Sequence, residues 1–97
     1  MERPTLSVLM PNYNHARYIG EALEAIMSQS CKPDEVIIID DASTDNSIEI
    51  IEQIIKDHHI VRLLRNDKNM GVNHNLKRLL ELAKSDYVHF AAADDRI

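Results

Sequence analysis

The alternation of short apolar runs with amphipathic segments is the feature that most constrains how this chain folds. Strand-length runs, mostly aliphatic or aromatic, occupy residues 6–10, 36–39, 61–64 and 87–91. Because polar alternation within them is weak, they are typical of strands buried on both faces of a parallel sheet. Between them, apolar residues recur at helical spacing in residues 19–27, 48–55 and 72–83. The resulting βαβαβαβ order predicts an α/β fold with an open, mostly parallel, Rossmann-like sheet.

Individual side chains around the second and third predicted helices give finer expectations. Asn46 is expected to cap the second helix, and Glu49 to complete a capping box. Ser43 and Asp45 are expected to solvate the preceding turn or cap the helix rather than bind a ligand. The apolar stripe expected on the third helix consists of Val72, Leu76, Leu79, Leu80 and Ala83.

Length, charge and cysteine content limit the class of protein. With 97 residues and 44% apolar content, the chain has the size and composition of one globular domain. Its net charge of −5 and its lack of a basic run argue against nucleic acid as a general partner. No run approaches the roughly 20 apolar residues that span a bilayer, so no membrane segment is expected. A single cysteine, Cys31, fits a reducing compartment, and we expect a cytoplasmic location.

Polar side chains follow three of the four predicted strands. Tyr13 comes after the first, Asp40 with Asp41 after the second, and Asp94 with Asp95 after the fourth. In open parallel sheets, ligands bind outside the carboxyl ends of the strands, where the strand order reverses. We therefore expect these carboxylates on the rim of a ligand crevice rather than in the core.

Each of these groups has a ligand role and a plainer alternative. One helix cap needs one acceptor, so Asp41 beside a second acid could instead accept the ring N–H of a uracil base. Asp94 and Asp95 could bind Mn2+ or Mg2+, which take oxygen ligands, or could belong to a solvated chain end. Tyr13 could stack on a base or pack beneath the next helix. Lys77 could contact a phosphate or lie on a solvated helix face.

Several familiar motifs are absent from the sequence. The chain has two glycines, Gly20 and Gly71, so it contains neither a GxGxxG nor a Walker A loop. It also lacks a GxSxG elbow. A dinucleotide-binding Rossmann domain and a P-loop NTPase are therefore poorly supported.

Four short motifs occur in a specific order: Pro-Asn-Tyr-Asn at 11–14, Asp-Asp-Ala-Ser-Thr-Asp at 40–45, Asn-Met-Gly-Val at 69–72 and Ala-Asp-Asp at 93–95. With them the chain resembles the N-terminal part of family-two glycosyltransferases, which have the GT-A fold. The resemblance covers essentially all 97 residues. It implies that residues 1–97 form the nucleotide-sugar-binding half of a glycosyltransferase domain, and that the acceptor-binding half is absent from this chain.

The resemblance also implies roles for individual residues. Asp41 would hydrogen-bond the uracil or other base, in a pocket lined by Pro11 and Tyr13. Asp95 would hold Mn2+ or Mg2+ on the diphosphate, supported by Asp94. The implied nucleotide-sugar contacts are Pro11, Tyr13, Asn14, Asp41, Lys77 and Asp94.

The implied reaction transfers a sugar from a nucleoside diphosphate donor, with a UDP-sugar favoured, to an acceptor hydroxyl with inversion. The general base is expected beyond Ile97, so this part alone is expected to be inactive. The expected partners are the donor and, through the absent half, a saccharide or other hydroxyl acceptor. Self-association through an exposed sheet edge is also expected.

The sequence departs from the family pattern in two places. Ala92 or Ala93 stands where the Asp-x-Asp metal motif has its first acid, and Leu76 with Lys77 replaces an Arg-Asn pair. Two other functions are open: a nucleotide-binding or scaffolding module without catalysis, and a receiver-like signalling domain. A receiver needs an acidic pair after its first strand, where this chain has Pro11.

Overall fold

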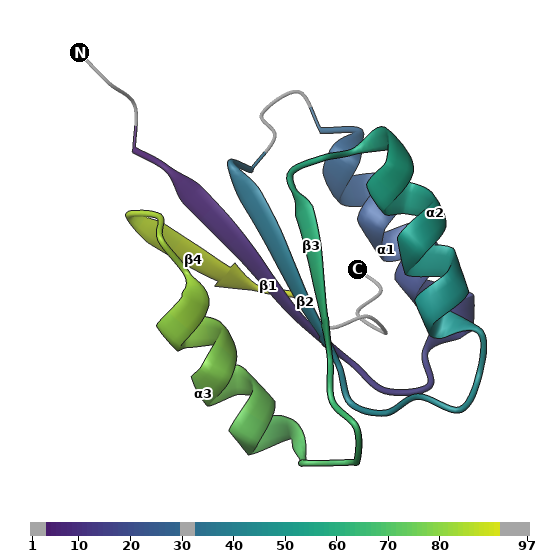
Figure 1. The fold of residues 1–97 in the computed structure, drawn as a ribbon. Helices are drawn as coiled ribbons and strands as arrows, with labels where there is room; N and C mark the ends of the chain where they lie inside the picture. Colours follow the sequence, from purple (N-terminus) through teal and green to yellow (C-terminus); the bar gives the residue numbers. More distant parts are fainter. Residues whose placement is uncertain (1–3, 30–32, 92–97) are drawn as a thin grey trace.

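Three helices and four strands alternate in a computed structural model that describes residues 4–29 and 33–91. The strands are β1 (Leu6–Asn12), β2 (Glu35–Asp40), β3 (Val61–Arg65) and β4 (Tyr87–Phe90). The helices are α1 (Ala16–Met27), α2 (Ser47–Asp57) and α3 (Val72–Leu82). The predicted βαβαβαβ order is therefore confirmed (Figure 1).

The strands of the described chain form one parallel sheet in the order β3-β2-β1-β4. The chain adds β2 and then β3 on one side of β1, and then returns across the sheet to place β4 on the other side. The strand order therefore reverses between β1 and β4. The open parallel sheet predicted from the sequence is confirmed.

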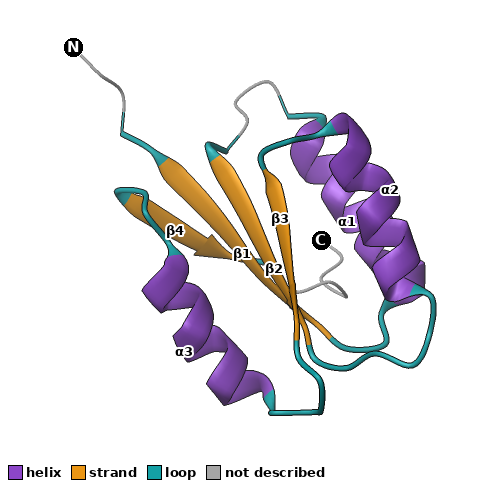
Figure 2. Cartoon of the chain, viewed as in Figure 1, coloured by secondary structure: helices purple, strands orange, loops and turns teal. Residues whose placement is uncertain are grey.

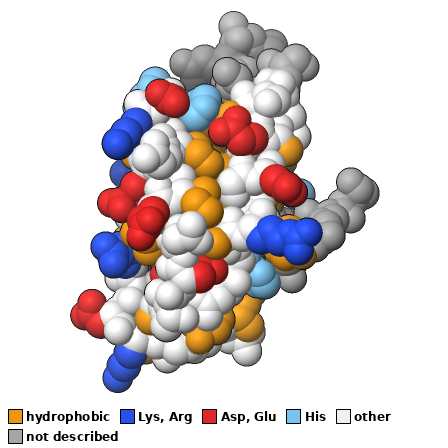
Figure 3. Space-filling view, turned by 90° about the vertical axis from the view of Figure 1, so that its right-hand side faces the viewer, with side chains coloured by type: hydrophobic (Ala, Val, Ile, Leu, Met, Phe, Trp, Pro, Cys, Tyr) orange, Lys and Arg blue, Asp and Glu red, His pale blue; other side chains and the backbone are white. Residues whose placement is uncertain are grey.

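Helices α1 and α2 cover one face of the sheet, and α3 covers the other (Figure 2). Right-handed crossovers explain this division, because a connection that runs in the opposite direction along the sheet places its helix on the opposite face. Figure 3 shows acidic and basic side chains interspersed over the side formed by α1 and α2. In the part of the chain that the structure describes, no helix is long and apolar enough to cross a membrane.

The central strand β2 is buried on both faces. Ile38 packs in the core beneath α1 and α2, whereas Ile37 and Ile39 pack with Leu79 of α3, and all four side chains are fully buried. Each such side chain contributes about 1.5–3 kcal/mol relative to an exposed position. The larger core, beneath α1 and α2, consists of Val8, Met10, Ile19, Leu23, Met27, Val36, Ile38, Ile51, Ile54 and Val61.

The edge strand β4 does not fit the prediction of burial on both faces. Tyr87, Val88 and Phe90 are 62%, 40% and 42% exposed. β4 pairs with β1, and α3 packs mainly against β1 and β2 rather than over β4. The prediction is wrong for this strand because its apolar composition does not reveal its place at the edge of the sheet.

The predicted apolar stripe of α3 is only partly buried. Leu79 is fully buried, but Val72 and Leu80 are 57% and 50% exposed. The polar Asn75, one turn before Leu79, is instead 1% exposed on the side that faces the sheet. The prediction that the whole stripe faces the sheet is therefore wrong, because Leu80 lies on the flank of the helix.

The beginning of α2 also differs from the prediction. The side chain of Asn46 makes no capping hydrogen bond, so the predicted capping box is wrong. Asp45 takes this role: its Oδ1 accepts hydrogen bonds from the Ser47 N–H at 3.0 Å and the Ser47 hydroxyl at 2.6 Å. Its Oδ2 accepts another from the N–H of Ala16, the first residue of α1, at 3.0 Å. One carboxylate thus stabilises two helix N-termini, which agrees with the structural role predicted for Asp45.

Candidate functional site

The carboxyl edge of the sheet, where the strand order reverses, brings together the loops that follow β1, β2 and β3. The N–H of Asn66 donates to the Asp40 carbonyl at 2.9 Å, which joins the loops after β3 and β2. On the other side of β1, the N–H of Ala91 donates to the Leu9 carbonyl at 3.0 Å and fixes the end of β4. Open parallel sheets bind their ligands at such an edge.

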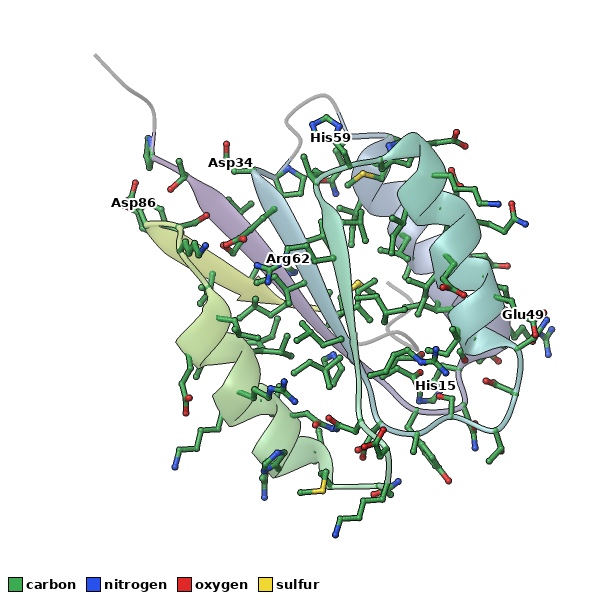
Figure 4. The ribbon with its side chains drawn as sticks, viewed as in Figure 1. His15, Asp34, Glu49, His59, Arg62 and Asp86 are labelled. Carbon is green, nitrogen blue, oxygen red and sulfur yellow. The ribbon has the colours of Figure 1, made fainter. Side chains whose placement is uncertain are left out.

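The opposite, amino end of the sheet holds acids with a structural role. The Oδ2 of Asp34 accepts a hydrogen bond from the Leu6 N–H at 2.8 Å. The Oδ2 of Asp86 accepts one from the Thr5 N–H at 3.1 Å. Figure 4 shows both acids at the end of the sheet away from His15, so they hold the beginning of β1 and lie outside the candidate site.

Asn14 joins the loop after β1 to the loop after β2. Its N–H donates to Ser43 Oγ at 2.9 Å, and its Oδ1 accepts from the N–H groups of Thr44 at 2.8 Å and Asp45 at 3.3 Å. Its φ of 54° lies in the left-handed region, which asparagine adopts more readily than most residues. The side chain of Asn14 therefore fixes the geometry of both loops, and its predicted contact with the nucleotide stays a prediction.

Tyr13 lies between Asn14 and the end of β1. Its side chain is 45% exposed, while Pro11 is half-buried within β1 and pairs in register with Ile39. An exposed ring on a fixed loop can stack on a flat ligand with little loss of conformational freedom. The base contacts predicted for Tyr13 and Pro11 stay predictions.

The adjacent carboxylates of Asp40 and Asp41 lie inside the protein. They are 2% and 4% exposed, so the prediction that they lie on the rim is wrong. The Oδ1 of Asp40 accepts hydrogen bonds from Asn12 Nδ2 at 2.8 Å and Ser43 Oγ at 2.7 Å, and its Oδ2 accepts from the Ser43 N–H at 2.9 Å. These donors replace water around the carboxylate, and Asp40 therefore holds the turn after β2.

Asp41 is held by the loop between β3 and α3. Its Oδ1 accepts hydrogen bonds from Asn66 Nδ2 at 3.0 Å and the Met70 N–H at 2.7 Å. Its Oδ2 accepts one from the Gly71 N–H at 3.0 Å. Burial acts to raise the pKa of this carboxyl, but the hydrogen bonds together lower the pKa below its ordinary value. Asp41 is therefore an anion at the N-terminus of α3, where free helix N–H groups favour negative charge.

Lys77 lies on the outer face of α3. It lines a shallow hollow of about 330 Å³ together with His74, Arg78 and Glu81. Residues two positions apart on a helix point in nearly opposite directions, and Leu79 faces the sheet, so Lys77 points away from it. The predicted contact of Lys77 with a phosphate stays a prediction.

The predicted metal ligands, Asp94 and Asp95, lie outside the described residues. Within residues 4–29 and 33–91, no group of three or more His, Cys, Asp or Glu side chains could hold a metal ion. The metal site predicted for Asp94 and Asp95 therefore stays a prediction.

Two asparagines at the carboxyl edge were not among the predicted site residues. Asn66 donates from Nδ2 both to Asp41 Oδ1 and, at 2.8 Å, to Asn75 Oδ1. The sequence contains a signal for Asn75, because it lies four residues before Leu79 on the same helical face, where an apolar residue is expected. Asn66 directly follows β3, at the same edge of the sheet as Asp41.

Comparison with known proteins relates the whole chain to one family. The model of the family described as Glycosyl transferase family 2 matches residues 7–97. Over 97 residues the chain is 39% identical to a protein of Haemophilus influenzae described as an uncharacterized glycosyltransferase. That match covers 100% of this chain and 39% of the H. influenzae protein.

Two solved structures contain the same fold. The mannosyltransferase PcManGT from Pyrobaculum calidifontis, in complex with GDP-Man and Mn2+, matches with a TM-score of 0.86 at 30% identity, over 97% of this chain and 28% of that one. S. aureus TarS 1–349 in complex with UDP-GlcNAc matches with a TM-score of 0.83 at 29% identity, over 93% of this chain and 26% of that one. The chain thus spans less than two fifths of the length of these three relatives. The predicted GT-A fold is confirmed, and the chain belongs to Glycosyl transferase family 2.

Proposed function

We propose that this chain forms the donor-nucleotide site of a glycosyltransferase that transfers a sugar from a nucleoside diphosphate to an acceptor hydroxyl. The observation that carries the proposal is the placement of the exposed Tyr13 and the charged Asp41 on loops that meet at the carboxyl edge of the sheet. The strand order reverses at that edge, which is the usual ligand position in such folds. The complexes of PcManGT with GDP-Man and of TarS with UDP-GlcNAc support it.

The base would be recognised by one aromatic and one acidic side chain. Tyr13 would stack on the base beside Pro11, with Asn14 holding the loop in place. Asp41, an acceptor-only group when ionised, would accept the ring N–H of the base. Uracil and guanine carry such an N–H, and the resemblance to the family favours a UDP-sugar as the donor.

A divalent metal ion would be held beyond β4. Asp94 and Asp95, which follow Ala91 by three and four residues in the sequence, are the ligands that we propose from the resemblance to the family. Carboxylate oxygens suit Mn2+ or Mg2+, and the PcManGT complex contains Mn2+. When bound, such an ion would stabilise the charge that develops on the departing diphosphate. Lys77 is the cationic side chain we propose for the same diphosphate.

Catalysis would require chain beyond this sequence. We propose transfer with inversion, with a general base and a saccharide or other hydroxyl acceptor bound by residues after Ile97. The greater length of the matched relatives supports this division. On its own the chain would bind the donor without transferring the sugar. The single thiol, Cys31, supports a cytoplasmic location.

The exposed edge strand β4 would mediate self-association. Its outer N–H and C=O groups lie beside the exposed side chains of Tyr87, Val88 and Phe90, and such an edge tends to pair with another chain. Light scattering is expected to show a mass that rises with concentration, and Tyr87→Lys is expected to reduce that rise. A wild-type chain that stays monomeric at every concentration would refute this part of the proposal.

Calorimetric titration with UDP and GDP, with and without Mn2+, tests the donor site. Nucleotide is expected to bind more tightly when Mn2+ is present. Asp41→Ala is expected to weaken binding in both conditions, whereas Asp95→Ala is expected to remove only the effect of the metal. Asp67→Ala is a matched control, because Asp67 is an exposed acid in the loop between β3 and α3. A folded wild-type chain that binds neither nucleotide in either condition would contradict the proposed function.

A further inference from the structure

The carboxylate of Asp41 is surrounded by more donors than a helix cap requires. Two hydrogen bonds reach its Oδ1, from Asn66 and Met70, and one reaches its Oδ2, from Gly71. An ionised carboxylate offers about four acceptor positions, two on each oxygen. The side chain of Asn75 also hydrogen-bonds this carboxylate. Oδ2 carries one of the three hydrogen bonds above and Oδ1 carries two, so Oδ2 is the oxygen with an acceptor position for a further donor.

Asn66 determines how this carboxylate is turned. Its Nδ2 joins Asp41 Oδ1 at 3.0 Å to Asn75 Oδ1 at 2.8 Å, and its Oδ1 accepts from Arg78 Nη1 at 3.3 Å. Its backbone N–H donates to the Asp40 carbonyl at 2.9 Å. Both the backbone and the amide of Asn66 are thus fixed, and the amide in turn restricts rotation of the Asp41 carboxylate.

The other end of this network lies on a helix packed against the sheet. Asn75 is 1% exposed, and its N–H donates to the Gly71 carbonyl at 3.2 Å within the first turn of α3. One turn later, Leu79 is fully buried in the core beneath that helix. The orientation of Asn66 is therefore set by a well-packed element rather than by the loop itself.

We propose that Asn66 is a positioning residue for base recognition: by holding Oδ1 of Asp41, it directs the remaining acceptor position of Oδ2 at the ring N–H of a nucleotide base. This inference rests on the proposed function, since it assumes a nucleotide at the carboxyl edge. It specifies the ligand as a nucleoside diphosphate whose base donates a ring N–H, which uracil and guanine do. Cytosine and adenine present a lone pair at the corresponding nitrogen and are disfavoured.

Titration of the 97-residue chain with two matched pairs, UDP with CDP and GDP with ADP, measures this preference as a ratio of Kd values. A hydrogen bond to a charged group changes affinity by about tenfold or more. In one of the two pairs, we therefore expect the wild-type chain to bind the nucleotide whose base carries the ring N–H (UDP or GDP) more tightly by that factor. Asn66→Ala is expected to bring the ratio close to one, with little change in affinity for the disfavoured base. Asn73→Ala, at an exposed asparagine of α3, is the matched control and is expected to keep the wild-type ratio.

The ratio separates positioning from a purely structural role. If Asn66→Ala weakens both nucleotides equally and leaves the ratio intact, the proposal is overturned. If thermal melting shows that Asn66→Ala is unfolded, Asn75→Ala replaces it. This variant keeps the Asn66 donor to Asp41 but removes both the anchor of Asn66 and the hydrogen bond between the Asn75 side chain and Asp41. An unchanged ratio in Asn75→Ala then overturns the proposal.

The wild-type titrations distinguish failure of this inference from failure of the proposed function. Equal affinity for both members of each pair overturns the role of Asn66 but retains a nucleotide site. A folded wild-type chain that binds none of the four nucleotides overturns both.

Discussion

Asp45 holds the beginnings of two helices at the candidate site. Its removal should therefore lower the free energy of unfolding by more than the loss of an exposed side chain usually does. Its Oδ1 bonds the N–H and hydroxyl of Ser47 at 3.0 and 2.6 Å, and its Oδ2 bonds the Ala16 N–H at 3.0 Å. Loss of one N-terminal cap typically costs about 1 kcal/mol. Because α1 and α2 both lose theirs, we expect Asp45→Ala to lower the free energy of unfolding by about 2 kcal/mol.

Asp45→Asn divides this effect into its two parts. Asparagine keeps one carbonyl oxygen that can accept from Ser47, but it turns an NH₂ group, which is a donor, toward the N–H of Ala16. The negative charge beside two helix N-termini is also lost. We therefore expect about half of the alanine effect, roughly 1 kcal/mol. Glu52→Ala, an exposed acid in the middle of α2, is the control and should stay within about 0.5 kcal/mol of the wild type.

Urea unfolding followed by circular dichroism measures these differences. The midpoint should fall in the order wild type, Asp45→Asn, Asp45→Ala, at an unchanged m value. In thermal melts, about 2 kcal/mol corresponds to a fall in Tm of roughly 8–16 °C for a domain of this size. If Asp45→Ala loses less than about 0.5 kcal/mol, water has replaced the carboxylate at both helices and the reasoning is refuted.

The other predictions concern backbone conformation and pH. Ala42 has a φ of 60°, so Ala42→Gly should stabilise the protein by about 0.5–1 kcal/mol, and a lower urea midpoint would contradict this. Gly71 has a φ of 91°, so Gly71→Ala should destabilise the protein by about 1–3 kcal/mol, although a Cβ there would meet no atom within 4 Å. An unchanged urea midpoint would show that the loop relaxes and would contradict this prediction. Burial acts to raise the pKa of Asp45, but hydrogen bonds from Ser47 lower it below its ordinary value of 3.8. The stabilisation by Asp45 is therefore complete above pH 3.8 and is lost as the pH falls through the lowered pKa. The difference in Tm between the wild type and Asp45→Asn should accordingly shrink on acidification. A difference that stays constant with pH would contradict this prediction.

The order of helices and strands could be predicted because hydrophobic period reflects local backbone geometry. The exposure of β4 could not, because similar apolar runs form the central strand at residues 36–39 and the edge strand at residues 87–90. Which run becomes an edge depends on where the chain crosses back over the sheet, and that is a property of the whole topology. For the same reason the stripe of α3 could not show that Leu80 would stay 50% exposed.

At the candidate site, the sequence predicted the meeting of two loops but not the burial of the acids. Parallel strands end at the same edge, so Tyr13 and Asp41 could be expected there. The donors to Asp41 include Asn66, Met70 and Gly71, which lie 25, 29 and 30 residues away along the chain. No local pattern links an acid to N–H groups at that separation. The sequence therefore predicted that this carboxylate lies on the rim of the crevice rather than in the protein interior.

The pleat of β2 explains why this strand is followed by two acids rather than one. Successive side chains of a strand point to opposite faces, so Asp40 follows Ile38 toward α1 and α2, whereas Asp41 follows Ile39 toward α3. Each face has its own loop with N–H groups that need acceptors: the loop after β2 for Asp40 and the loop before α3 for Asp41. The pair therefore holds both sides of the carboxyl edge in fixed positions, and a base bound between Tyr13 and Asp41 would meet a preformed site.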